Sequence, residues 1–295
     1  MPNTRDGHGG GKSTRPRGSQ ATLRAQERIA AERATQKRAE ARRRFLVPTA
    51  AVTAVLAVVG ALFAVKLSSA PATASESPAS SVVVRQVTTV PAAVLTRVSP
   101  GQAATPLQTV QAAGPPLTIG GKPAIVFVSE ESCPFCAAER WPVAVALAHF
   151  GTWSHLGSTR SSATDVYPNT ATLSFRTAQY RSDELTLRTT ELADSAGRPL
   201  QAQTPLDNKL IDTYDVPPYV NSADQSGAVP FLDIGNRYIL AGAQYNPQVL
   251  ADLSATQIAS QLRNPSSPVA KAIDGSARVM IAAINRVLHD RAAHS

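Results

Sequence analysis

Two cysteines, Cys133 and Cys136, are the residues of this sequence whose type and spacing most directly imply chemistry. They are the only cysteines in the 295-residue chain, and Pro134 and Phe135 separate them. An apolar run ends just before the pair and a helical pattern begins with it, so we expect a junction between a strand and a helix there. Two thiols at this spacing are typical of a couple that alternates between dithiol and disulfide.

The expected helix start would make the two sulfurs chemically unequal. If Cys133 is the N-cap and Pro134 the first helical residue, unpaired backbone N–H groups and the positive end of the helix dipole face the Cys133 sulfur. Both favour its thiolate, which is the attacking species. Cys136, one turn later, is placed to attack the resulting mixed disulfide and release the partner. Phe135 adds no charge or donor, which favours a milder oxidant than histidine would give there.

A metal site and a purely structural disulfide are the alternatives to redox exchange. Zinc needs four ligands, and the five histidines include no pair at ligand spacing near the cysteines, so we expect no metal and no cofactor. A disulfide that only stabilises the fold remains open, although so short a loop contributes less stabilisation than a long one. The spacing therefore favours redox use.

An uncharged apolar stretch from Phe45 to Val65 predicts a transmembrane helix over residues 45–66. Its 21 residues would form a helix about 31 Å long, against about 30 Å for the hydrocarbon core of a bilayer. Three arginines, residues 42–44, precede it and only Lys66 follows, which favours a cytoplasmic N-terminus and an exported main domain. We therefore expect a single-pass protein of the cell membrane, with the cysteines outside the cytoplasm, where a disulfide can persist.

A cleaved export signal is the competing interpretation of the same stretch. Residues 42–46 resemble a twin-arginine signal, and Ala72-Thr73-Ala74 resembles a small-residue cleavage site. The 44-residue arm is long for the start of a signal peptide, and 21 apolar residues exceed the usual ~7–15. A retained anchor is the favoured interpretation.

The net charge of +8 belongs to the first 44 residues. They contain 12 of the 29 Lys and Arg and 4 of the 21 Asp and Glu, which leaves 17 of each kind in the rest. We expect this basic cytoplasmic arm, residues 1–44, to be partly helical or disordered. The rest of the chain carries equal numbers of acidic and basic residues and has no general attraction for polyanions, so we expect no nucleic-acid partner. Binding of nucleic acid or a cytoplasmic partner by the basic arm is the least favoured of the three functions.

Residues 67–90, rich in Ser, Ala, Pro and Thr, are expected to form a flexible linker, and residues 91–293 the exported domain. In that domain, the continuous apolar run from Pro123 to Val128 predicts a central strand buried on both faces. Val229 to Gly235 and Tyr238 to Leu240 predict a hairpin. The expected helices span 91–98, 133 to about 150 with a kink at Pro142, 206–214, 254–263, 267–275 and 276–289.

This order of elements, with Val229-Pro230 opening the hairpin, resembles the thioredoxin fold. The resemblance implies an α/β domain in which Pro230 is cis beside the reactive pair and Val229 binds substrate backbone. Residues 133–141, Cys-Pro-Phe-Cys-Ala-Ala-Glu-Arg-Trp, are similar to an uncharacterised actinobacterial family of membrane-anchored thioredoxin-like proteins, over about residues 80–290. This implies a thiol–disulfide oxidoreductase whose partners are extracytoplasmic protein thiols or disulfides and an unidentified electron partner. A non-enzymatic thioredoxin-like scaffold with a structural disulfide is the alternative.

Departures from the thioredoxin pattern affect the expected mechanism. Ser132 stands where thioredoxins carry tryptophan, and Phe127 where they carry a buried acid. Proton transfer at Cys136 then needs another group, although carboxylates ordinarily lie on solvated loops and helix faces. The nearby candidates are Glu130, Glu131 and Glu139.

The separation of Cys136 and Pro230 by 93 residues exceeds what a crossover connection requires. We therefore expect an insertion, partly β, over residues 160–228. It could shape a substrate groove or cover an edge of the sheet.

Overall fold

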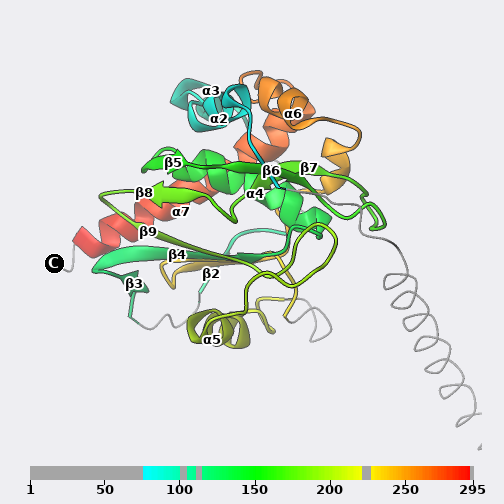
Figure 1. Cartoon of the computed structure of the whole chain (residues 1–295). Helices are drawn as coiled ribbons and strands as arrows, with labels where there is room; N and C mark the ends of the chain where they lie inside the picture. The colour runs from blue at the N-terminus through cyan, green and yellow to red at the C-terminus, as the bar shows by residue number, and fades with distance from the viewer. Residues whose placement is uncertain (1–75, 100–104, 111–114, 221–226, 293–295) are drawn as a thin grey trace, which may run out of the picture. The chain divides into compact units, whose positions relative to one another are not determined.

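The computed structural model describes residues 76–99, 105–110, 115–220 and 227–292 (Figure 1). The expected basic arm and transmembrane helix, residues 1–44 and 45–66, lie outside these ranges. No helix within the described ranges is long and apolar enough to cross a membrane.

Strand β4 (Lys122–Ser129) lies at the centre of the main sheet, and every residue after Lys122 is buried. Strand β9 (Thr186–Glu191) pairs with it in parallel, and β10 (Phe231–Ile234) pairs with it antiparallel. The neighbouring strands and the helices on both faces of the sheet shield β4 from water, which is why its sequence is continuously apolar. The predicted central strand is confirmed.

The hairpin of β10 and β11 (Tyr238–Ala241) continues the sheet beyond β4. Gly235 and Asn236 form its turn with φ values of 63° and 57°, a left-handed conformation that these two residue types tolerate. The predicted hairpin is confirmed. Two short strands, β2 (Gln108–Thr109) beside β11 and β3 (Thr118–Ile119) beside the start of β4, complete the sheet.

Helices cover both faces of this sheet, and alternate residues of β4 face opposite sides. Ile125 and Phe127 pack in the core with residues of α4 (Pro134–Leu147) and α7 (Pro268–Ala292). Val126 and Val128 pack with α5 (Pro205–Tyr214) on the other face. The domain is a mixed α/β fold with α4 and α7 on one side and α5 on the other (Figure 1).

A second set of strands covers α4 on the side away from the main sheet (Figure 1). The Trp141 indole donates to the Ala171 carbonyl at 3.2 Å, and the Thr172 hydroxyl donates to the Ala137 carbonyl at 2.7 Å. These bonds join α4 to the covering sheet. Its strands are β1 (Ser77–Pro78), β6 (Gly157–Arg160) and β7 (Ala171–Ser174), with β5 (Thr152–Ser154) and β8 (Gln179–Arg181) as a separate pair.

The predicted insertion over residues 160–228 is too broad. Its second half contains β9 and α5, which belong to the central sheet and to the layer that covers it. The strands from β5 to β8 lie outside the central sheet. Sequence separation alone could not distinguish a covering sheet from a strand that returns to pair with β4.

The predicted flexible linker is wrong for its described part, residues 76–90. Helix α2 (Ser81–Thr88) begins at Ser80, whose side chain accepts a hydrogen bond from Val83 N, and it buries Val83 and Val87. It packs against α6 (Ala255–Gln261) and is followed by α3 (Ala92–Arg97), the first of the expected helices. Burial of the valine side chains outweighs a composition that favours a disordered chain.

The C-terminal helices confirm one boundary and correct another. The capping box of Ser254 and Gln257 starts α6, as its sequence predicts, after the short 3₁₀ helix η2 (Pro247–Leu250). In contrast, the two helices expected over 267–289 are one continuous helix, α7. Gly275, the expected stop, is buried within it. A glycine costs a helix only about 1 kcal/mol, which core packing offsets.

Candidate redox site

Cys133 is the N-cap of α4, as the sequence predicts. Its φ and ψ of −77° and 124° are extended, Pro134 follows in the first helical turn, and the Cys133 sulfur accepts a hydrogen bond from Cys136 N at 3.3 Å. Strand β4 ends at Ser129, shortly before this helix start. Both cysteines are free thiols.

The two thiols differ in exposure and in acidity. Cys133 is 9% exposed and Cys136 is 0% exposed. The pKa of Cys133 is lowered, chiefly because the Cys136 thiol donates a hydrogen bond to it, with help from the backbone N–H groups of Cys136 and Phe135. Burial raises the pKa of Cys136 well above its ordinary value. Cys133 is therefore the more acidic and the more exposed of the two thiols.

Val229 and Pro230 lie beside Cys133, although they are almost 100 residues away in sequence. The Cys133 thiol donates to the Val229 carbonyl at 3.7 Å, across 96 positions of the chain. The Val229–Pro230 peptide bond is cis, as the resemblance implies. Antiparallel pairing of Phe231 with Val128 brings this turn to the end of β4 where the cysteines lie. The structure thus brings all four predicted site residues together.

The three candidate acids occupy different surroundings. Glu130 is partly exposed and accepts from the Ser132 hydroxyl at 2.8 Å. Glu131 is buried, accepts from the Ser174 hydroxyl at 2.6 Å, and has a pKa raised by burial. Glu139 is also buried and accepts from Gln244 N at 2.9 Å, and burial raises its pKa to about 8. The expectation of solvated positions is therefore wrong for Glu131 and Glu139.

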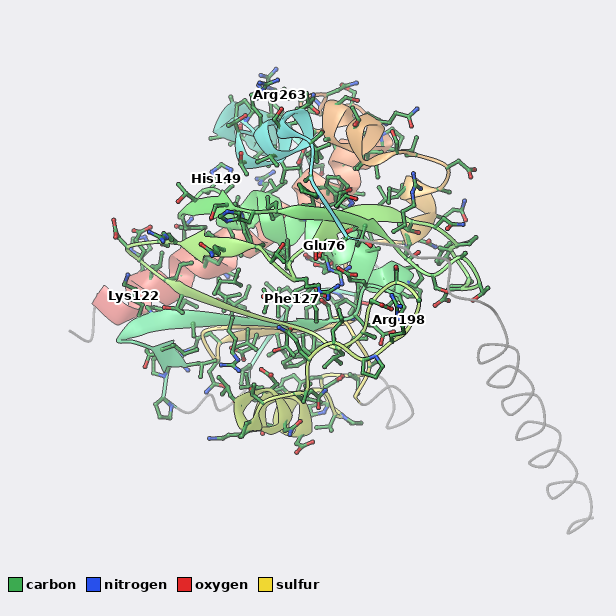
Figure 2. All side chains as sticks on the ribbon, viewed as in Figure 1. Glu76, Lys122, Phe127, His149, Arg198 and Arg263 are labelled. Atoms are coloured by element: carbon green, nitrogen blue, oxygen red, sulfur yellow. The ribbon has the colours of Figure 1, made fainter. Side chains whose placement is uncertain are left out.

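Phe127 occupies the interior behind the site with an apolar ring (Figure 2). Its ring meets that of Phe175 edge-on, with centroids 5.9 Å apart. This contact explains why an aromatic residue is accommodated at the position where the thioredoxin pattern has an acid. Phe127 carries no charge, so a side-chain charge that acts on the Cys136 sulfur must come from another residue.

A buried ion pair, which our sequence reasoning missed, supplies such a charge. Arg140 Nε and Nη2 donate to Glu191 at 2.9 and 2.6 Å, and Nη2 also donates to the Ser129 hydroxyl at 3.3 Å. Arg140 is one helical turn after Cys136, and its positive charge lowers the pKa of that thiol, against the effect of burial. Arg140 follows Cys136 by four residues in the predicted helix, and this spacing was the signal that could have revealed its proximity to Cys136.

An apolar rim lies next to Cys133. Phe135 is 39% exposed and contacts Tyr167 edge-on, with ring centroids 5.8 Å apart, and the neighbouring Val166 is 65% exposed. A backbone hydrogen bond of 2.8 Å from Ser162 N to the Ser132 carbonyl holds this β6–β7 loop against the site. The surroundings of Cys133 therefore include exposed apolar side chains.

Across the part of the chain that the structure describes, no cluster of three or more His, Cys, Asp and Glu side chains could hold a metal ion. The polar chemistry at this end of the sheet consists of two thiols, backbone N–H groups and the buried charges described above.

A family model described as a domain of unknown function, DUF929, matches residues 108–286. No curated protein and no solved structure matches the chain. The matched segment runs from β2 into α7 and includes the central sheet, the cysteine pair and Val229-Pro230. Because this match covers more than half of the sequence, the chain belongs to the DUF929 family.

Proposed function

We propose that this chain is a thiol–disulfide oxidoreductase with a thioredoxin-like domain, in which Cys133 and Cys136 exchange with protein thiols outside the cytoplasm. The observation that carries the proposal is the inequality of the two sulfurs. Cys133 caps α4, is 9% exposed and has a lowered pKa, while Cys136 is fully buried and has a raised pKa.

The topology supports the thioredoxin-like assignment. Strand β4 leads through the cysteines into α4 and on to the parallel strand β9, and the antiparallel hairpin β10–β11 and the helix α7 follow. The turn that contains Val229 and Pro230 contacts the Cys133 sulfur. The similarity of residues 133–141 to membrane-anchored thioredoxin-like proteins of actinobacteria supports the same assignment.

The proposed exchange has two balanced steps. The Cys133 thiolate attacks one sulfur of a client disulfide, a Cys133–client disulfide forms, and the other client sulfur leaves as a thiolate. The Cys136 thiolate then attacks the Cys133 sulfur, so that the Cys133–Cys136 disulfide forms and the client leaves fully reduced. The client gains two electrons and the pair loses two. The reverse sequence oxidises a client dithiol, and the reduction potentials of the client and the electron partner set the direction.

Two features support a protein rather than a small thiol as the client. The rim of Phe135 and Val166 offers apolar contact area next to Cys133. The Val229 carbonyl contacts the same sulfur, and the resemblance to the thioredoxin fold implies that Val229 binds substrate backbone. Residues 45–66 would anchor this domain to the outer face of the cell membrane, with residues 1–44 in the cytoplasm.

Trapping with a Cys136→Ala variant tests the function. Without Cys136 the mixed disulfide cannot be resolved, so the full-length variant, expressed in cells and alkylated before lysis, should accumulate mixed disulfides several-fold over the wild-type protein. They would appear on a non-reducing gel as larger species that disappear on reduction. The Cys133→Ala variant is the matched control and should form none. Absence of such species from Cys136→Ala would favour the non-enzymatic scaffold.

A further inference from the structure

A buried pair of opposite charges lies beneath the cysteines, and the exchange as described above does not use it. Arg140 is 0% exposed, and the carboxylate of Glu191, at the end of β9, binds it through both oxygens. Removing two charges from water is costly, and an apolar pair of the same volume often gives equal stability. Stability is therefore a weak explanation for the presence of this pair.

The hydrogen bonds of Arg140 are incomplete on one side of the guanidinium. Nε and Nη2 are occupied by Glu191 and the Ser129 hydroxyl, whereas the buried Nη1 has no hydrogen-bond partner among the described residues. An unsatisfied buried donor is unfavourable and calls for an explanation. A negative charge that develops nearby in another state of the protein would provide one.

Cys136 is the group that acquires such a charge. It precedes Arg140 by four residues in α4, so the two side chains lie one turn apart on the same side of the helix, and both are fully buried. The positive charge of Arg140 favours the Cys136 thiolate, and the thiolate in turn raises the pKa of Arg140. Cys133, Glu131 and Glu191 are the other titratable groups that interact with one member of this pair or the other.

We propose that Arg140 is a positioning residue for the second step of the exchange, in which its guanidinium stabilises the negative charge on the Cys136 sulfur. This inference rests on the exchange proposed above. Cys136 first ionises, and its proton is released to solvent. Its sulfur lone pair then forms the bond to Cys133, the bond between Cys133 and the client sulfur breaks, and the client leaves as a thiolate.

The first step is independent of Arg140. Hydrogen bonds at the N-terminus of α4 stabilise the Cys133 thiolate, and Arg140 is not among the main causes of its lowered pKa. A variant without the buried charges should therefore react normally at Cys133 and slowly at Cys136. This separation distinguishes a positioning role from general damage to the fold.

Reaction of the reduced full-length protein with dithiobis(nitrobenzoate), followed at 412 nm in a stopped-flow instrument, resolves the two steps. Attack by Cys133 releases one nitrothiobenzoate and leaves the second bound as a mixed disulfide. Attack by Cys136 then releases the second. The Cys136→Ala variant should show the first release alone, which identifies the two phases.

The double variant Arg140→Met/Glu191→Leu removes both charges and keeps similar side-chain volumes, so that no charge is left buried without its partner. We expect its second phase to slow at least about tenfold at pH 7 and the pH midpoint of that phase to rise by about one unit or more, since one pKa unit is tenfold in thiolate. The first phase should stay within about twofold of the wild type. The matched control is Arg198→Met, which breaks the ion pair of Arg198 with Asp194, where the arginine is largely exposed.

Glu191→Gln provides a variant with the opposite expected effect. It removes the negative charge that offsets Arg140 and retains an oxygen acceptor, so the second phase should accelerate about threefold or more at pH 7 and its midpoint should fall. A purely structural role for the pair predicts no acceleration. This variant also keeps the test decisive if the double variant does not fold.

The outcomes separate the two proposals. If the wild-type protein releases no nitrothiobenzoate, Cys133 is unreactive and the proposed function fails, together with this inference. If the wild type shows both phases but neither the double variant nor Glu191→Gln, each with a wild-type circular dichroism spectrum, alters the second, the role of Arg140 is wrong and the exchange function stands.

Discussion

At the scale of single residues, burial decides which groups of this protein are reactive. Cys133 and Cys136 are chemically identical and three positions apart. A hydrogen bond from the Cys136 thiol, together with the backbone N–H groups at the start of α4, lowers the pKa of Cys133, whereas full burial raises the pKa of Cys136. The same effect acts on acids. Glu139 lies 0% exposed on α4, and burial raises its pKa to about 8. Because the pKa of Glu139 is higher in the folded protein than in the unfolded chain, the stability of the protein depends on pH.

The raised pKa of Glu139 predicts that this residue makes the protein less stable as pH rises. Between its ordinary value of 4.5 and about 8, the folded state retains a proton that the unfolded chain has lost, so stability falls across that window. The Glu139→Gln variant keeps an acceptor for Gln244 N and has no such proton. Relative to wild type it should gain on the order of 4 kcal/mol in free energy of unfolding between pH 4.5 and pH 8.

Urea denaturation at a series of pH values measures this difference. Asp274 and Asp233, whose pKa values burial raises to about 8 and about 7, titrate in overlapping windows, so the comparison of variant with wild type isolates Glu139. Glu184→Gln, at an exposed position, controls for the loss of one carboxyl group. Stability curves of wild type and Glu139→Gln that run parallel from pH 4.5 to pH 8 would contradict the prediction.

At the scale of elements, local patterns indicated the helix and strand ends that carry the site. The N-cap at Cys133, the proline that follows it and the hairpin turn at Gly235 and Asn236 all depend on neighbouring residues. Elements whose formation depends on distant contacts were misjudged. Helix α2 was expected to be flexible, and Gly275 was expected to end a helix, because neither pattern shows what packs against it.

Helix α2 should contribute measurably to the stability of the domain. Val87 is fully buried in the core, so Val87→Ala should lower the free energy of unfolding by about 1–3 kcal/mol through lost apolar burial and a residual cavity. Val82→Ala is the matched control, because Val82 is an exposed valine of the same helix, and its effect should stay within about 0.5 kcal/mol. Equal effects of the two substitutions in urea denaturation would show that α2 does not pack as described.

At the scale of the whole molecule, the DUF929 match spans the central sheet and the cysteine pair, residues 108–286. The expected anchor, residues 45–66, lies before it and outside the described residues. Where the domain resides determines what its thiols meet, since a disulfide persists outside the cytoplasm and is reduced within it. The proposed function therefore depends on the topology of the N-terminal stretch.

A retained anchor predicts a full-size membrane protein with an exported domain. The protein should remain in the membrane fraction after an alkaline wash, and protease added to intact cells should digest a C-terminal tag and spare an N-terminal one. A tagged cytoplasmic protein controls for cell integrity. Loss of ~7–8 kDa from the mature protein on a denaturing gel would instead indicate cleavage of a signal peptide.

The sequence by itself determined the thiol pair, the strand and helix that present it, the hairpin that begins after Pro230 and the absence of further cysteine ligands. These features follow from residue type and short-range periodicity, which neighbouring residues set. Only the tertiary structure decided what surrounds the sulfurs. The contact of Val229 with Cys133 spans 96 positions, and that of Arg140 with Glu191 spans 51. Burial and buried charge, which act on the acidity of Cys136, are properties of such distant contacts, and a local pattern does not contain them.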